Sequence, residues 1–382
     1  MPVVRVCRLI PSFVTLLWLL GCDGDRVVGP AVSTESPGSN PACTVTVDGD
    51  MVFTLVVRKW YGGRAAAVSI TLDNPWGTHA LHHLATDAAI ARGLRMDLEI
   101  VTASFVDPRW KPLLDTYRDV LMPQGIHFFG HGHTHALHDT LSYEDCLASF
   151  GTCFDLMQAW GLHPRAYAYP GSSGEKASTQ AANRDAGFIC ARGSTVDARL
   201  FHIVPDEVAE PDNWYFLPAV PMGNASYRYI QSHTQLAPIL EAAVEQTSWV
   251  ILMYHAIGIP EGWSYYPLAE YHRDLDQIAG GDFWSANLDQ AAAYLRERLA
   301  LQMRVESVLH RSGAYRLTFD DALPDEVYDQ PLTVDLELAP GSRIRRILVD
   351  PPVGGVGAFD VRDGTVRLDL LPTSTPRVLA LE

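Results

Sequence analysis

The feature that most constrains the fold is an alternation of strand and helix patterns between about residues 65 and 300. Residues 65–72 form a continuous, mostly apolar run, which is typical of a strand that is buried on both faces. Further strand patterns, each followed by a helix pattern, occupy residues 96–105, 126–129, 165–169, 188–191 and 249–254. Such strands pair in parallel through crossover helices. A count of about seven strands therefore predicts an α/β fold with a distorted or incomplete (β/α) barrel.

The last part of the chain has a different pattern. From residue 303 onward, short alternating apolar runs between Pro and Gly turns replace the helix patterns. This change predicts a small all-β, sandwich-like domain over residues 303–382. Residues 43–302 are assigned to the barrel domain.

The N-terminus has the features of an export signal. Basic residues precede a short apolar run that ends in Leu-Leu-Gly-Cys22, which predicts a signal peptide over residues 1–21. The apolar run is too short for a comfortable membrane span. The residues around Cys22 also resemble the lipobox of bacterial lipoproteins, which implies lipidation of Cys22 and anchoring to a membrane of the cell envelope. The alternative is an ordinary secretory signal. Residues 22–42, rich in Gly, Pro and Ser, predict a flexible tether.

Charge and cysteine content narrow the class of protein further. The formal net charge is -16, which excludes a nucleic-acid partner because phosphate binding needs a positive surface. Beyond the leader, the cysteines are Cys43, Cys146, Cys153 and Cys190. An exported chain could pair them, and Cys146 with Cys153 is one candidate pair, although the pairing stays open. The oligomeric state stays open as well.

A dense run of histidines follows the strand pattern at residues 126–129. Its members are His127, His131, His133, His135 and His138. Neutral imidazole is a common metal ligand, and on a helical turn His131 and His135 would share one face and could hold one cation. The sequence therefore indicates a metal site, with a solvated polar loop as the alternative interpretation.

Three elements occur in a fixed order along the chain: Asp73 after a buried strand, His131-x-x-x-His135, and His255 after the strand at residues 249–254. In this order the chain resembles the polysaccharide deacetylases, the carbohydrate esterase group that includes chitin and peptidoglycan deacetylases. The resemblance covers roughly residues 65–300. It implies a distorted (β/α) barrel that removes acetyl groups from a glycan with one divalent metal ion, zinc in the first place and cobalt or manganese as alternatives.

The resemblance also implies roles for individual residues. Thr-Leu-Asp73-Asn74 is similar to the first family motif, Thr-Phe-Asp-Asp, so Asp73 takes the position of the catalytic base and Asn74 that of a metal ligand. Asn carries no charge, so metal affinity should fall or the preferred metal should change. His131 and His135 match the metal-binding histidines, and His255 matches the general acid.

The stretch Tyr169-Pro170-Gly171 resembles the third motif of the family and is expected to contact substrate. The family has an arginine that orients the catalytic base where this chain has Ala168, and Arg165 is a possible substitute. Trp76 is a candidate for stacking on a sugar ring, because flat aromatic faces suit pyranoses.

One literal motif match is misleading, and two other functions stay open. Residues 317–321 read Leu-Thr-Phe-Asp-Asp, but they follow His255 and are expected to be a strand end and turn. The expected function is removal of acetyl groups, N-acetyl before O-acetyl, from an extracellular glycan. The alternatives are a carbohydrate-binding or scaffold lipoprotein with a decayed site, and a hydrolase of a non-peptide C–N bond in another substrate.

Overall fold

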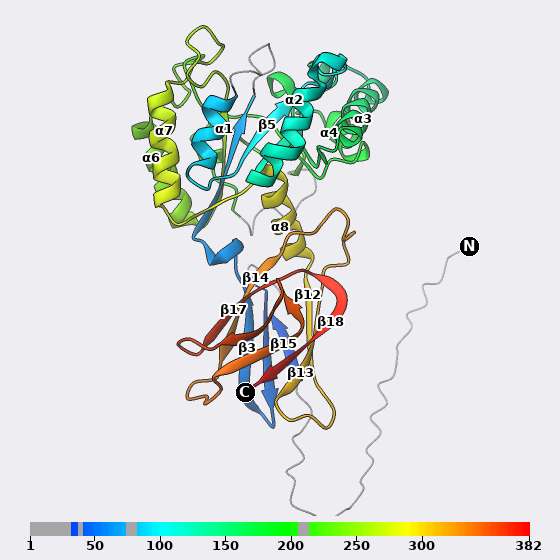
Figure 1. The fold of residues 1–382 in the computed structure, drawn as a ribbon, viewed down its shortest axis with the longest axis vertical. Helices are drawn as coiled ribbons and strands as arrows, with labels where there is room; N and C mark the ends of the chain where they lie inside the picture. The colour runs from blue at the N-terminus through cyan, green and yellow to red at the C-terminus, as the bar shows by residue number, and fades with distance from the viewer. Residues whose placement is uncertain (1–31, 37–40, 74–81, 205–213) are drawn as a thin grey trace, which may run out of the picture.

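The computed structural model describes residues 32–36, 41–73, 82–204 and 214–382. It has two parts, an α/β part drawn at the top of Figure 1 and a β sandwich drawn below it. Helix α8 (Leu288–Ala300) leads from the first part into the second.

The α/β part is built on one eight-stranded sheet with parallel pairings. The strand order is β8-β7-β6-β5-β4-β10-β9, and β11 also pairs with β4. The strands are β4 (Ala66–Leu72), β5 (Met96–Ile100), β6 (Ile126–Gly130), β7 (Ala166–Ala168), β8 (Cys190–Arg192), β9 (Val220–Pro221), β10 (Trp249–Tyr254) and β11 (Phe283–Ser285). Every residue of β4 is buried, as expected for a central strand covered on both faces. The curled sheet confirms the predicted incomplete (β/α) barrel.

Helices surround this sheet (Figure 1). Besides α8 they are α1 (His83–Ile90), α2 (Lys111–Thr116), α3 (Tyr143–Ala159), α4 (Ala177–Asp185), α6 (His233–Gln246) and α7 (Leu268–Gly280). Local sequence explains where two of them begin. Ser142 caps α3 by accepting a hydrogen bond from the backbone N–H of Asp145 at 3.1 Å. Asn287 and Gln290 form a capping box at the start of α8, and Nδ2 of Asn287 also donates to the carbonyl oxygen of Met96 in β5 at 2.9 Å.

The β sandwich consists of two five-stranded antiparallel sheets, ordered β1-β2-β3-β14-β17 and β12-β13-β18-β15-β16. The strands are β1 (Val32–Ser36), β2 (Ala42–Val47), β3 (Asp50–Val57), β12 (Gln302–Ser307), β13 (Ala314–Asp320), β14 (Leu332–Leu338), β15 (Arg346–Val353), β16 (Val356–Asp360), β17 (Thr365–Leu370) and β18 (Thr373–Leu381). Alternate residues of β3 are buried between the sheets, namely Phe53, Leu55 and Val57. The predicted all-β domain is therefore confirmed.

The sandwich contains two strands that were expected to belong to the barrel domain. Strands β2 and β3 were expected to begin the barrel domain, but β3 pairs with β14 in the sandwich, with Val57 opposite Val334. An alternating pattern exposes one face of a strand, which suits a sandwich and not the doubly covered sheet of the barrel. Strand β1 lies within the expected tether and pairs with β2. The sandwich is thus assembled from both ends of the described chain.

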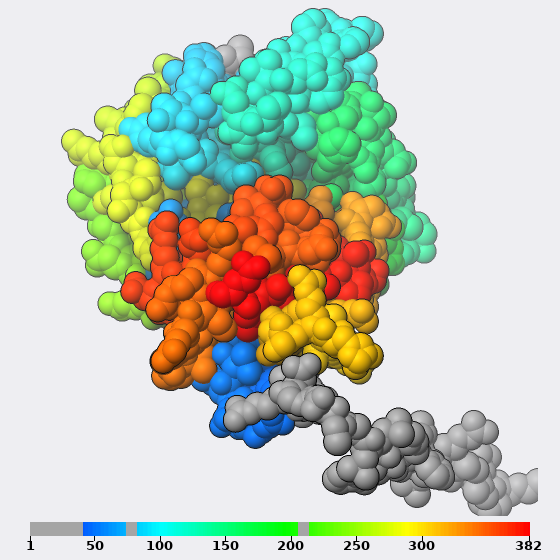
Figure 2. All heavy atoms as spheres, turned by 60° about the horizontal axis from the view of Figure 1, so that its bottom comes forward, coloured from blue at the N-terminus to red at the C-terminus, as the bar shows by residue number. Residues whose placement is uncertain are grey.

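The two parts share a hydrophobic core at their junction. The ring of Trp284 lies 6.4 Å from that of Trp60 and 5.2 Å from that of Tyr294, centroid to centroid. The Tyr294 hydroxyl donates a hydrogen bond to the carbonyl oxygen of Arg58 at 2.8 Å. Figure 2 looks at the molecule from the side of the sandwich, which lies directly against the α/β part. The amino ends of the parallel strands face the sandwich, and their carboxyl ends point away from it.

The structure bears on some of the expectations about single segments. The leader, Cys22, Asn74 and Trp76 lie outside the described residues. Cys146 and Cys153 are buried and form no disulfide with each other, so this candidate pair is wrong. Both lie on α3, seven residues and therefore about 10 Å apart along the helix axis. The described residues contain no helix that is long and apolar enough to cross a membrane. The misleading motif is a strand end, at Asp320 of β13, as expected.

Candidate active site

Polar side chains gather where the parallel strands end. Asp73 follows β4, His131 follows β6 and His255 follows β10, while Arg192 is the last residue of β8. Because the carboxyl ends of parallel strands share one edge of a sheet, these residues come together there. They surround a cavity of about 820 Å³. Its lining includes Asp73, His131, His135, Tyr169, Gly171, Ser172, His255, Glu261 and Trp263.

A buried ion pair holds Asp73. Nη2 of Arg192 donates to Oδ1 of Asp73, and the two side chains are only 1% and 5% exposed. Burial alone would raise the pKa of Asp73, but Arg192 and the nearby imidazoles outweigh it and lower that pKa. The carboxylate is therefore ionised at neutral pH and can accept a proton.

Arg192 corrects the expectation that Arg165 orients this base. Arg165 donates to Oδ1 of Asp329 at 2.7 Å, at the opposite end of the sheet. The family motif puts this arginine at the position of Ala168 on β7, whereas the partner of Asp73 comes from the adjacent strand β8. An arginine directly after the apolar residues of that strand was the signal that could have identified it.

His131 and His135 present their rings to each other at the cavity. Nδ1–H of His131 donates to the carbonyl oxygen of Ala168 at 2.9 Å, which turns Nε2 away from that bond. The ring centroids of His131 and His135 are 4.9 Å apart. Burial lowers the pKa of His131 to about 3 and also lowers the pKa of His135, so both imidazoles are neutral at pH 7. Two neutral imidazoles bound to one tetrahedral ion have centroids about 5 Å apart, and this pair has the same spacing.

The backbone around these histidines differs from the expected helical turn. Residues 131–137 form a loop, in which His135 has a φ of 57°. A left-handed residue lets the loop fold back, which brings His135 towards His131 without a helix.

The other histidines of the run point elsewhere. Nδ1 of His133 is 2.9 Å from Oγ1 of Thr102. The ring of His138 stacks on Phe150 with centroids 4.3 Å apart. These contacts leave His131 and His135 as the histidines of the run that line the cavity.

Glu99 is an acidic neighbour that the sequence analysis missed. It lies in β5 and is buried, with Oε2 3.4 Å from Nε2 of His131. Ligand atoms of Asp73, Glu99 and His131 all lie within 4.8 Å of one another. The signal in the sequence was a charged residue inside a strand pattern, directly before the last residue of the strand.

His255 lies on the cavity wall beside Trp263, with ring centroids 4.3 Å apart. Burial lowers the pKa of His255 to about 4, although Asp73 opposes this change. The ring is therefore neutral at pH 7 before substrate binds. To act as the predicted general acid, it must first take up a proton.

The third motif also reaches the cavity. Tyr169 and Gly171 line it, and Pro170 is buried beneath them in a short 3-10 turn (Pro170–Ser172). Gly171 has a φ of 57°, a backbone conformation that favours glycine. The predicted contact of these residues with substrate is compatible with this position and stays a prediction, as do the roles of Asn74 and Trp76.

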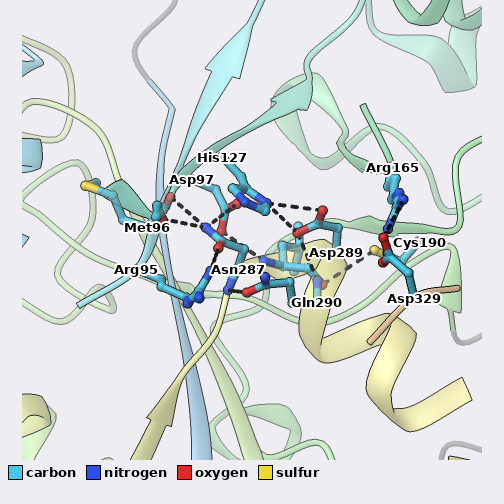
Figure 3. A network of polar contacts seen from close by, with 12 residues as sticks. Arg95, Met96, Asp97, His127, Arg165, Cys190, Asn287, Asp289, Gln290 and Asp329 are labelled. Atoms are coloured by element: carbon cyan, nitrogen blue, oxygen red, sulfur yellow. Dashed lines mark hydrogen bonds and ion pairs between the residues drawn. The ribbon is translucent and has the colours of Figure 1, made fainter. Parts of the chain in front are cut away.

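A second group of acidic and imidazole side chains lies at the amino ends of β5 and β6. We call Asp97, His127 and Asp289 the basal cluster (Figure 3). Oδ2 of Asp97 accepts the backbone N–H of Leu288 at 2.9 Å, and Nδ1 of His127 is 3.1 Å from Oδ1 of Asp289. The basal cluster therefore attaches the first turn of α8 to the sheet.

Solved structures of related fold include carbohydrate deacetylases. A family 4 carbohydrate esterase from Streptomyces lividans, in complex with acetate, is 15% identical over 58% of this chain and 92% of its own, with a TM-score of 0.38. Agd3, described as a novel carbohydrate deacetylase, is 9% identical over 89% of this chain and 72% of its own, with a TM-score of 0.45. Puue allantoinase is 13% identical over 61% and 91%, with a TM-score of 0.44.

No protein-family model and no curated protein sequence matches the chain. At these identities and TM-scores the chemistry has to be inferred from the residues of the site.

Proposed function

We propose that the chain is a metal-dependent hydrolase that removes acetyl groups, N-acetyl in the first place, from an extracellular glycan. One observation carries this proposal. A buried carboxylate paired with an arginine, two imidazoles with ring centroids 4.9 Å apart, and a further histidine meet at one cavity. A base, a metal site and a proton donor are the parts that hydrolysis of an amide requires.

His131 and His135 would hold the cation, which supplies polarisation of the acetyl carbonyl and a lower pKa for water at the site. Arg192 occupies Oδ1 of Asp73, so Oδ2 is the oxygen that takes the proton of the attacking water. Arg192 also keeps Asp73 ionised until that step. Negative charge then develops on the acetyl oxygen and raises the pKa of His255, so that this imidazole can take up a proton from solvent and pass it to the leaving nitrogen. Asp73 afterwards returns the proton of the attacking water to solvent, which restores the site.

The shape of the cavity supports a sugar substrate. Its volume of about 820 Å³ is in the range of pockets for small ligands, which is enough for one or two sugar rings. Trp263 lies at its rim with 61% of its surface exposed and offers a flat face to a ring.

We place the protein at the cell envelope, held to the membrane through a lipid on Cys22. The apolar leader and the sequence around Cys22 support this placement. Radiolabelled palmitate should enter the native chain and not a Cys22→Ser variant. Labelling of both proteins, or of neither, would contradict a lipid anchor at this residue.

Acetate release tests the enzymatic proposal. Purified protein would be incubated with zinc and with acetylated chitooligosaccharide, acetylxylan or peptidoglycan, beside His131→Ala and His133→Ala. His133 is a matched control, because it lies in the same loop and bonds Thr102. Release by the native protein and by His133→Ala, but not by His131→Ala, is the expected result. Bound zinc without acetate from any of the glycans would contradict the proposal and favour a binding role or another C–N bond.

A further inference from the structure

We propose that Glu99 is the carboxylate ligand of the cation site, in place of the charged ligand that Asn74 cannot provide. The inference rests on the proposed function in that His131 and His135 hold the same cation. It adds a residue from β5, which none of the sequence motifs includes.

The first argument is the hydrogen bonding of His131. Nδ1–H donates to the carbonyl oxygen of Ala168 at 2.9 Å, so in the neutral ring Nε2 is an acceptor. The atom it faces, Oε2 of Glu99, is 3.4 Å away and is also an acceptor when the carboxylate is ionised. Two acceptors attract each other only through a proton or a cation that lies between them.

The distance agrees with a cation. A tetrahedral zinc ion binds imidazole nitrogen at about 2.0–2.1 Å and carboxylate oxygen at about 2.0–2.2 Å, which places the two ligand atoms about 3.4 Å apart. The separation of Nε2 and Oε2 is 3.4 Å. Glu99 and His131 would then supply two of the protein ligands, beside His135 as the proposed function assigns it.

The second argument is the position of Glu99 on the sheet. Strands β4 and β5 pair with Thr71 opposite Asp97 and Leu72 opposite Leu98. The next pair in this register is Asp73 with Glu99, so Glu99 lies at the same edge of the sheet as the predicted base. A carboxylate from the neighbouring strand can therefore restore the charge that Asn74 lacks.

The third argument is electrostatic. Glu99 is buried within β5, and a ligand atom of it lies within 4.8 Å of one of Asp73. Arg192 pairs with Asp73, and a divalent cation would be attracted to the place where the ligand atoms of Asp73, Glu99 and His131 converge.

Zinc affinity of the full-length protein tests the inference without reference to activity. Metal-free protein would be titrated with zinc against a chromophoric chelator for the native chain, Glu99→Gln, Asn74→Ala and Asp97→Asn. Asp97 is a matched control, because it lies two residues earlier on the same strand and bonds the start of α8. We expect the Kd for zinc to rise at least about 100-fold in Glu99→Gln, to rise less in Asn74→Ala and to stay within about twofold in Asp97→Asn.

Circular dichroism would show whether Glu99→Gln is folded, and Glu99→Asp provides a second variant that keeps the charge. Glu99→Asp should bind zinc more tightly than Glu99→Gln, and the visible spectrum of the cobalt form should change between them. Native zinc affinity in Glu99→Gln would overturn the inference, since Glu99 would then be an acid that merely bonds His131. A 100-fold loss in Asn74→Ala alone would also overturn it.

The two proposals can fail separately. If zinc binding depends on Glu99 but no glycan releases acetate, the proposed function fails and the ligand assignment stands. If acetate is released and Glu99→Gln keeps the native Kd, the ligand assignment fails and the function stands.

Discussion

The two ends of strands β5 and β6 carry the same kinds of residue and use them differently. At the amino ends, Asp97 and His127 belong to the basal cluster (Figure 3). At the carboxyl ends, Glu99 and His131 face each other beside the cavity. The basal carboxylates accept hydrogen bonds from backbone N–H groups of α8, such as that of Leu288. The difference shows that similar clusters of acidic and imidazole side chains have different uses. The cluster beside the cavity is a candidate reactive site, whereas the cluster that bonds α8 is structural.

The imidazoles of His127 and His131 differ in their pKa between the two ends of the sheet. Burial lowers the pKa of His127, but Asp289 and Asp97 outweigh it and raise that pKa. Burial lowers the pKa of His131 to about 3, and neighbouring groups do not reverse it. A protonated imidazole pairs with a carboxylate, whereas a neutral one can bind a metal ion. The basal histidine is therefore suited to structure and the other to ligation.

The largest effect should come from Asp73→Asn at the cavity, compared with the same substitution, Asp97→Asn, at the other end of the sheet. Asp73→Asn removes the proposed base and should lower the rate of acetate release about 10²–10⁴-fold. Asp97→Asn makes the same chemical change in the basal cluster and should leave the rate of the folded protein within about twofold. The measurement is kcat on acetylated chitooligosaccharide. A large loss in Asp97→Asn, with an intact fold, would remove the functional distinction between the ends.

The next effect concerns arginines that hold carboxylates at the two ends. Arg192→Gln leaves Asp73 buried without its partner and should lower the free energy of unfolding by about 3 kcal/mol. Arg165→Gln removes a partner of Asp329, whose side chain is 60% exposed, and should cost about 0–1 kcal/mol. Urea unfolding of both variants checks this difference. Equal losses would mean that burial does not distinguish the two ion pairs.

A third prediction uses pH. Glu297 lies buried on α8, and burial, with Asp321 and Asp329 nearby, raises its pKa to about 9. Above the ordinary pKa of a glutamic acid, the unfolded chain therefore releases a proton that Glu297 keeps in the folded protein. Stability from this group is present at low pH and is lost as the pH rises towards about 9. Asp73, with a lowered pKa, contributes in the opposite direction.

Replacing Glu297 with Gln, which resembles the protonated acid, should remove this dependence. Between about pH 5 and pH 8, the free energy of unfolding of the native protein should fall by up to about 1.4 kcal/mol more per pH unit than that of Glu297→Gln. Urea unfolding at three pH values measures both slopes. Parallel slopes would show that Glu297 is ionised in the folded protein.

Sequence patterns predicted the parts of the molecule that depend on local order. The alternation of apolar strands and helices is visible in any short window, so the barrel and the all-β tail could be predicted. Asp73, His131, His135 and His255 could be placed at one site because the carboxyl ends of parallel strands share an edge.

The remaining features depend on contacts between distant residues. Strand β3 pairs with β14, and the ion pair of Arg58 with Asp335 that accompanies it spans 277 positions. Arg192 reaches Asp73 from a strand that carries no family motif. Glu99 becomes significant only through the register of β4 and β5. A pattern along one chain contains none of this information.

The smallest predicted effect concerns access to the cavity. The cavity lies at the carboxyl ends of the strands, whereas the amino ends face the sandwich. Trp263 is an exposed ring at the cavity rim, and its stacking on a sugar should be worth about 0.5–1.5 kcal/mol. Trp263→Ala should therefore raise KM for an acetylated oligosaccharide by about two- to tenfold and change kcat less. Tyr227→Ala is the control, because Tyr227 is exposed but does not line the cavity. If KM rises equally in both variants, the effect belongs to the general surface. If it rises only in Trp263→Ala, the glycan enters past this ring and reaches the imidazoles from the side away from the sandwich.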